Sequence, residues 1–158
     1  MPAQSAGLLL FRRTPDGLEV LLGHMGGPYF ARRDAGGWSI PKGEYGPDEP
    51  PLNAARREFE EELGAAPPDS AVIELGTVRQ RNGKHVTAWA LESDFDAASA
   101  VSNTFELEWP PRSGRIQTFP EVDRAAWFDV ETARTKMVAG QDALLDRLLA
   151  ALDGLAAE

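Results

Sequence analysis

Three glutamates in one short segment are the residues of this chain best suited to chemistry. Glu58, Glu61 and Glu62 stand at positions i, i+3 and i+4, so a helix would bring their carboxylates to one face. Like charges this close repel each other, and partial burial would raise their pKa values. A divalent cation relieves that repulsion, and hard oxygen ligands of this kind suit Mg²⁺ or Mn²⁺ together with phosphate oxygens. The cluster therefore predicts a metal site that takes a phosphorylated ligand.

The residues around these glutamates predict a helix with defined ends. Pro50 and Pro51 suit its first turn, where a missing N–H costs little, and Gly64 suits a left-handed residue that stops it. Between these ends an apolar stripe recurs at helical spacing, made of Leu52, Ala55, Phe59 and Leu63. A glutamate-rich helix face is by itself most often a solvated surface. The prediction of a site therefore depends on the flanking residues.

Those flanking residues form a specific pattern. Gly43 is followed by Glu49 and then by the run Arg57-Glu58-Phe59-Glu60-Glu61-Glu62-Leu63-Gly64-Ala65. The pattern resembles the Nudix box, the signature of the Nudix hydrolases, and departs from it only where small Ala65 replaces a branched aliphatic residue. The resemblance implies metal-dependent hydrolysis of a phosphoanhydride in a nucleoside diphosphate linked to another group. It also implies the Nudix fold, an α/β/α sandwich with a mixed β-sheet.

The resemblance further implies roles for the residues of the box. The catalytic glutamates and metal ligands would be Glu58, Glu61 and Glu62. Glu58 would serve as general base or ligand, because relatives differ over which glutamate accepts the proton of the attacking water. The carbonyl oxygen of Gly43 would join the metal ligands. Arg57 would pair with Glu49 and brace the loop rather than take part in the reaction.

A further ligand and several cations are expected outside the helix. Many relatives add one glutamate from a loop before the last strand, and Glu121 occupies that place, with Glu106 and Glu108 as alternatives. Phosphate contacts are expected from Arg32, Arg33, Lys42 and Arg112. Each of these cations taken alone would also fit a solvated surface.

Other side chains have less specific roles. A nucleotide base would need an aromatic platform, for which Trp38, Tyr29 and Trp109 are candidates, although aromatic residues in such settings often belong to the core. His24 and His85 stand at the ends of strand-like runs, where a structural role is more common than catalysis.

The rest of the chain predicts one α/β domain over residues 1–158. The expected strands cover residues 6–12, 18–24, 38–40, 71–81, 84–92 and 125–128. Asn82-Gly83 is a strong signal for a two-residue hairpin. The expected helices beyond the box cover residues 130–137 and 142–152. Residues 102–115 predict a long irregular loop, which in compact domains tends to be functional or mobile.

Composition bounds the function. The net charge of −9 argues against sequence-independent binding to nucleic acid but not against a small phosphorylated substrate. The absence of cysteine excludes a disulfide framework and a thiol nucleophile. The apolar run at residues 6–11 is too short for a signal sequence or a membrane span, so a cytoplasmic protein is expected. Homodimers are common in the family that the chain resembles.

The residues leading into the box bear on the substrate. Pro41-Lys42-Gly43 is similar to relatives that cleave dinucleoside polyphosphates or diphosphoinositol polyphosphates, and a lysine there suits a long, highly charged phosphate chain. The tyrosine that dinucleoside polyphosphate hydrolases often carry after the box has no match at residues 81–83. The favoured substrate is a dinucleoside polyphosphate, with nucleoside triphosphate pyrophosphohydrolysis as the alternative. A non-catalytic Nudix-fold sensing module is the remaining class, although no glutamate of the box is missing.

Overall fold

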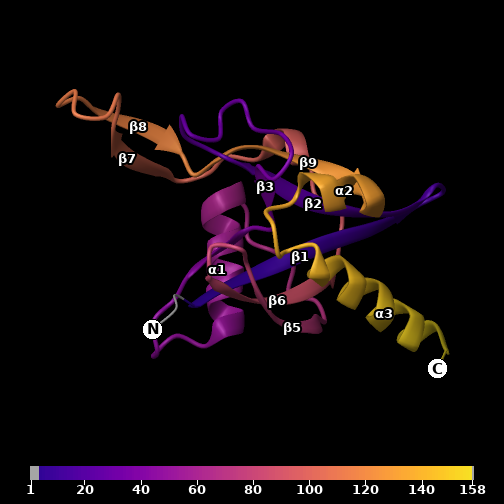
Figure 1. Ribbon diagram of the computed structural model, residues 1–158. Coiled ribbons are helices and arrows are strands. Elements are labelled where there is room, and N and C mark those ends of the chain that lie inside the picture. The colour runs from indigo at the N-terminus through magenta and orange to yellow at the C-terminus, as the bar shows by residue number, and fades with distance from the viewer. Residues whose placement is uncertain (1–3, 158) are drawn as a thin grey trace.

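A mixed sheet with helices on both faces is the frame of the protein (Figure 1). The computed structural model describes residues 4–157. The main sheet contains β1 (Gln4–Thr14), β2 (Gly17–Met25), β3 (Trp38–Ser39), β4 (Lys42–Glu44), β5 (Ile73–Arg79), β6 (His85–Glu92) and β9 (Val122–Asp129). Its order is β3-β2-β1-β6-β5, with β4 paired to β1 and β9 paired to β2. β1 and β6 run parallel, whereas the other pairs are antiparallel.

Helices cover the two faces of this sheet. They are α1 (Pro51–Leu63), α2 (Val130–Lys136) and α3 (Ala143–Ala157), with one 3₁₀ turn at Ala97–Ser99. Successive side chains of β1 alternate between the faces: Leu9 and Phe11 pack in the core under α2 and α3, whereas Leu8 and Leu10 pack in the core under α1. All four are buried. The expected α/β/α sandwich is confirmed.

The predicted helix ends are also confirmed. Pro51 is the first residue of α1, and Gly64 closes it in the left-handed conformation at φ 84°. A side chain at Gly64 would place its Cβ 2.6 Å from the carbonyl oxygen of Val101. Glycine is therefore required there both by the left-handed backbone and by this close contact. In α3 the apolar face, with Leu144 and Leu148 fully buried, packs on the sheet as expected. In the part of the chain that is described, no helix is long and apolar enough to cross a membrane.

A fork between β1 and β2 positions the loop that leads into the box. The two strands pair near their shared turn, up to the pair Phe11 and Val20. Beyond that point residues 38–44 enter between them, with β3 pairing to β2 and β4 pairing to β1. This insertion puts Lys42 and Gly43 against α1. The fork therefore fixes the backbone opposite the glutamate-bearing helix.

The prediction of an irregular loop at residues 102–115 is wrong. β7 (Thr104–Glu108) and β8 (Ile116–Pro120) form a separate two-stranded antiparallel sheet. Figure 1 shows this hairpin projecting from one end of the main sheet. The Trp-Pro-Pro-Arg-Ser-Gly sequence that suggested a loop forms only the turn between the strands. β9 also begins at Val122, earlier than the strand predicted at residues 125–128.

Candidate active site

Arg57 ties together three of the glutamates around the start and middle of α1. It donates two hydrogen bonds to Glu49, at 2.8 and 2.9 Å, one to Glu58 at 2.9 Å and one to Glu61 at 3.2 Å. The bonds with Glu49 are the main reason why the pKa of Arg57 lies above its ordinary value. A planar guanidinium suits this arrangement because it can serve one carboxylate with two donors while reaching others. Arg57 thus offsets part of the negative charge that the box concentrates.

Glu58 lies directly on the backbone of Gly43. A Cβ atom at Gly43 would be 2.0 Å from the carboxyl carbon of Glu58 and 2.2 and 2.3 Å from its oxygens. Only glycine allows so close an approach. Glu58 is 7% exposed, and this burial raises the pKa of its carboxyl, opposed by Arg57 and reinforced by Glu61. The buried carboxylate of Glu58 therefore occupies the position that a side chain at residue 43 would take.

Glu62 is the most strongly perturbed carboxylate of the site. Burial raises its pKa to about 8, although the backbone N–H of Lys42 donates to its Oε1 at 3.1 Å and the charge of Lys42 favours the ionised form. Burial likewise lowers the pKa of Lys42, and Glu62 opposes that shift. These two residues form a partly buried acid–base pair at the point where the fork meets α1.

Glu121 comes to the same place from the far end of the chain. Its carbonyl oxygen accepts from the N–H of Gly26 at 2.9 Å, and its own N–H donates to the carbonyl oxygen of Asn103 at 2.9 Å. A Cβ at Gly26 would lie 1.8 Å from the carbonyl oxygen of Pro120, so these backbones touch. Burial and then the charge of Glu61 raise the pKa of Glu121. The backbone of Glu121 is therefore held from both sides while its carboxyl faces the site.

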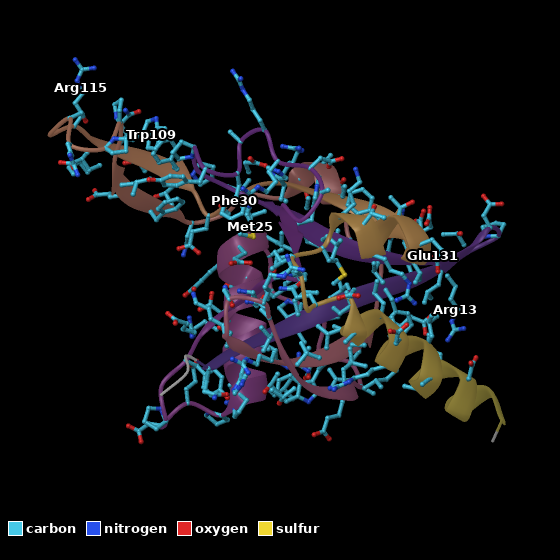
Figure 2. The ribbon with its side chains drawn as sticks, viewed as in Figure 1. Arg13, Met25, Phe30, Trp109, Arg115 and Glu131 are labelled. Atoms are coloured by element: carbon cyan, nitrogen blue, oxygen red, sulfur yellow. The ribbon has the colours of Figure 1, made fainter. Side chains whose placement is uncertain are left out.

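Lys42, Glu62 and Glu121 border a cavity of about 260 Å³. One part of its wall is charged, from Lys42, Glu62 and Glu121, and another part is apolar. The apolar part consists of Met25, Phe30, Phe105 and Val122, and Gly23, Gly26 and Ser39 complete the lining. Figure 2 shows Met25 and Phe30 next to one another above one end of α1.

The carboxylates of the site are engaged with protein groups rather than gathered around one point. Within residues 4–157, no three acidic or imidazole side chains are arranged to hold a metal ion as they stand. Arg57 holds Glu58 and Glu61, and the amide of Lys42 holds Glu62. The donor set nevertheless fits a hard divalent cation, because three carboxyls with raised pKa values face a common region. The groups available to it are Gly43, Glu58, Glu61, Glu62 and Glu121.

The expected phosphate contacts do not all come together. Lys42 lines the cavity. Arg32 and Arg33 lie on the loop at residues 26–37 and border outer hollows instead, with the guanidinium of Arg33 5.3 Å from the ring centre of Phe30. Arg112 lies in the turn between β7 and β8 at φ 63° and does not line the cavity. Lys42 is thus the one cation of the expected set that borders it.

The aromatic platforms suggested by the sequence are not in the cavity. Trp38 is 4% exposed and packs against the rings of His24 and Phe128 at 5.1 and 4.8 Å. Tyr29 and Trp109 pack edge-to-face against each other at 5.1 Å and do not line the cavity.

Phe30 and Phe105 are the aromatic residues that line it, and sequence reasoning missed both. For Phe105 a signal existed, because residues 104–108 alternate between polar and apolar side chains as a half-buried strand does. For Phe30 no local pattern distinguishes it within its loop.

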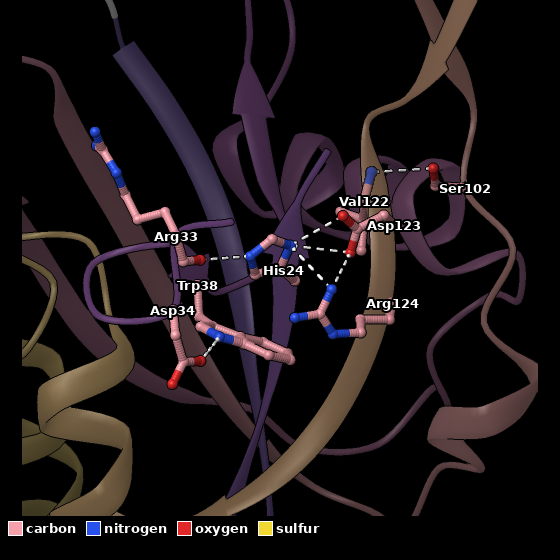
Figure 3. A network of polar contacts seen from close by, with 8 residues as sticks. All are labelled: His24, Arg33, Asp34, Trp38, Ser102, Val122, Asp123 and Arg124. Atoms are coloured by element: carbon pink, nitrogen blue, oxygen red, sulfur yellow. Dashed lines mark hydrogen bonds and ion pairs between the residues drawn. The ribbon is translucent and has the colours of Figure 1, made fainter. Parts of the chain in front are cut away.

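His24 joins the loop at residues 26–37 to β9 (Figure 3). It is fully buried, and its Nδ1 lies 2.9 and 3.0 Å from the carboxylate oxygens of Asp123. Its Nε2 lies 2.7 Å from the carbonyl oxygen of Arg33, which can only accept, so Nε2 carries a proton. Arg124 donates to the same carboxylate at 3.1 Å. His24 therefore has a structural role, as the sequence predicts. It connects the loop at residues 26–37 to Asp123, which lies two residues after Glu121 in the chain.

Known proteins resemble this chain in sequence pattern and in fold. The NUDIX domain model matches residues 1–148. An Ap4A hydrolase of C. elegans, in a binary complex, is 23% identical with a TM-score of 0.66, covering 95% of this chain and 98% of that one. The NUDIX domain of Shewanella oneidensis NrtR, complexed with ADP ribose, is 16% identical with a TM-score of 0.63, covering 96% and 89%. A mutT/nudix family protein from Listeria innocua is 18% identical with a TM-score of 0.64, covering 98% and 97%.

No curated protein matches the chain. At these identities the similar structures demonstrate the fold alone. The family match is broader evidence, because it extends over nearly the whole sequence and coincides with an intact box on α1 and its loop. The chain therefore belongs to the NUDIX domain family of hydrolases.

Proposed function

We propose that this Nudix pyrophosphohydrolase cleaves a phosphoanhydride bond in a dinucleoside polyphosphate and uses Mg²⁺ or Mn²⁺ as its cofactor. The observation that carries the proposal is one cavity with two unlike walls. Lys42, Glu62 and Glu121 give it a charged wall, and aromatic side chains give it an apolar one. A nucleotide has the matching form, with phosphates at one end and a flat base at the other.

The residues of the box would divide the work of hydrolysis. When bound, the cation would orient the phosphates, offset their charge and lower the pKa of the attacking water. The buried carboxyl of Glu58, with its raised pKa, suits the acceptance of that water's proton. Arg57 would keep Glu58 and Glu61 in place through the hydrogen bonds that it already makes. Lys42 would face the phosphate chain from the β4 side.

Two observations favour a substrate with two nucleoside ends. The fold is similar to that of an Ap4A hydrolase. Met25 and Phe30 also line a second hollow of about 370 Å³, which includes Arg33, Arg81 and Asn82. Two hollows that share a wall, one beside the carboxylates and one lined by arginines, suit a chain of phosphates with a group at each end.

The size of the first cavity supports the second candidate. At about 260 Å³ it is just below the range of about 300 to 1,000 Å³ that is typical of small-molecule sites. A cavity of this size fits one nucleoside, which a nucleoside triphosphate would supply. A nucleoside triphosphate pyrophosphohydrolase is therefore the alternative function.

Product analysis with a nucleotide panel tests these proposals. The panel contains diadenosine polyphosphates, ADP-ribose, and normal and oxidised nucleoside triphosphates, each with Mg²⁺, with Mn²⁺ and with chelator. The matched variants are Glu62→Gln at the cavity and Glu60→Gln on the exposed side of the same helix. We expect metal-dependent cleavage of diadenosine polyphosphates that Glu62→Gln abolishes and Glu60→Gln retains. Cleavage of triphosphates alone would favour the alternative, and binding of intact nucleotide without cleavage would indicate a sensing module.

A further inference from the structure

The apolar wall of the cavity is built by two segments that lie outside the Nudix box. Phe30 comes from the loop at residues 26–37, and Phe105 comes from β7 of the separate hairpin. Both rings are half-buried and border the same cavity. Met25, at the end of β2, lies between the loop and the main sheet and completes this wall.

Close backbone contacts hold Phe105 at the cavity. A Cβ at Gly27 would be 2.9 Å from the tip of the Phe105 ring, so the loop backbone lies directly on that ring. On β8 the ring of Phe119, opposite Phe105 in the strand register, supports it with a centroid distance of 6.0 Å. Because neighbours on two sides restrict it, the ring loses little further freedom when a ligand packs on it.

Phe30 is held within its own loop. Its N–H donates to the carbonyl oxygen of Gly27 at 3.3 Å, and its carbonyl oxygen accepts from the N–H of Arg33 at 2.9 Å. The His24 contact with the carbonyl oxygen of Arg33 then anchors this turn to the core. The two aromatic residues thus belong to preformed structure.

The contents of the cavity wall restrict what can bind there. Charged groups lie at one side and phenyl rings with a flexible methionine lie at the other. Flat, uncharged rings gain from stacking on aromatic side chains, and methionine adapts to the remaining edge. The volume of about 260 Å³ is of the size of one such group with its sugar.

We propose that Phe30 and Phe105 are the nucleobase-binding residues of this enzyme and thereby select for a nucleotide rather than for polyphosphate alone. The assignment rests on the proposed nucleotide hydrolysis and adds which side chains recognise the base. It makes the β7–β8 hairpin a part of the substrate site. Tyr29 and Trp109 contact each other edge-to-face outside the cavity and do not line it.

A pair of non-hydrolysable probes separates base recognition from phosphate recognition. Adenosine 5′-(α,β-methylene)diphosphate carries base and phosphate analogue, whereas methylenediphosphonate carries only the latter. Binding of each to the full chain is measured by calorimetry with Mg²⁺ for Phe30→Leu and Phe105→Leu. Tyr29→Leu and Trp109→Leu serve as controls, since they remove an aromatic ring from the neighbouring position or the same hairpin without touching the cavity.

We expect each phenylalanine variant to weaken binding of the nucleotide analogue by roughly five- to a hundredfold, the range for one base–aromatic stack. Binding of methylenediphosphonate stays unchanged, and the controls leave both affinities unchanged. Circular dichroism checks that each variant is folded. Equal losses for both probes, no loss at all, or larger losses in the controls would overturn the assignment.

The outcome for base binding is distinguishable from the outcome for hydrolysis. If the wild-type protein cleaves no nucleotide but its analogue affinity depends on Phe30 and Phe105, the proposed reaction fails and the base site stands. If the protein cleaves nucleotides and both leucine variants keep the wild-type KM, the base site fails and the proposed reaction stands.

Discussion

The charged and aromatic walls of the cavity are built in opposite ways. Two of the three residues of the charged wall, Lys42 of β4 and Glu62 of α1, are joined by a hydrogen bond, and the other box glutamates beside them are held by Arg57. The aromatic wall joins Phe30 and Phe105, which are far apart in sequence. Phe105 is held by packing against the backbone of Gly27, and Phe30 is held by hydrogen bonds within its own loop. Proton transfer and metal binding need fixed atoms, whereas stacking tolerates a range of bases. We infer that the first wall determines the reaction and the second determines the substrate.

The largest expected effect tests whether the box glutamates beside the charged wall act independently of the aromatic wall. Glu58→Gln removes the candidate base while keeping the side-chain volume, so kcat should fall by roughly 10²- to 10⁴-fold. Binding of the methylene nucleotide analogue should be retained, because the aromatic wall is untouched. Steady-state kinetics and calorimetry on the same preparation check both. A variant that also lost its affinity for the base would show that the walls are coupled.

Gly43→Ala tests the close approach of Gly43 and Glu58 beside the charged wall. Its Cβ would meet the Glu58 carboxylate at 2.0 to 2.3 Å, so the carboxylate or the loop must shift. We expect a loss of about a hundredfold in kcat, the effect of misplacing a reactive group by about 1 Å. Gly46→Ala is the matched control in the same loop, because nothing lies within 4 Å of its added Cβ. Equal activities of the two variants would contradict the assigned role of Gly43.

Gly26→Ala tests the backbone contact that connects the loop at residues 26–37 to the segment of Glu121. Gly26 lines the cavity and bonds to Glu121, and an added Cβ would lie 1.8 Å from the carbonyl oxygen of Pro120. We expect the free energy of unfolding to fall by about 1–3 kcal/mol, as for other overpacked sites. Gly154→Ala, in α3 with open space around it, should instead raise it by about 0.5–1 kcal/mol. Urea titration measures both changes. An unchanged free energy of unfolding in Gly26→Ala would show that the two backbone segments can move apart to accept the added Cβ.

The last prediction concerns the pH dependence of stability at Glu62. Burial raises the pKa of its carboxyl from 4.5 to about 8, so the folded protein binds this proton more tightly than the unfolded chain does. The resulting stability is fully present below about pH 4.5 and is lost as the pH rises through about 8. In chelator, the thermal midpoint of the wild type should therefore decline relative to that of Glu62→Gln between pH 5 and 9, an interval set around those two values.

Parallel curves for the two proteins would show that Glu62 does not titrate in this interval. Added Mg²⁺ should reduce the decline, because a bound cation stabilises the ionised carboxylate. Comparing the curves with and without Mg²⁺ thus tests whether the charged wall holds the cation.

The sequence by itself determined the parts of the protein that depend on local spacing. The apolar stripe and end signals of α1, the two hairpins β1–β2 and β5–β6, and the gathering of glutamates on one helix face all follow from periodicity and turn chemistry. The two-residue length predicted for the turn at Asn82-Gly83 is wrong, because Arg79 pairs with His85 and the N–H of Gln80 donates to the carbonyl oxygen of Lys84. The pairing of Arg57 with Glu49 follows from the pattern of the box.

Only the tertiary structure decided which distant segments meet at the cavity. Phe105 belongs to a hairpin whose proline- and glycine-rich turn led to the prediction of an irregular loop. Phe30 has no sequence pattern around it that indicates its position at the cavity. Trp38 is buried and Arg112 lies in the turn between β7 and β8, away from the cavity. Both positions likewise depend on long-range packing. Local spacing constrains residues within one element, whereas contacts between elements depend on where the whole chain buries its apolar surface.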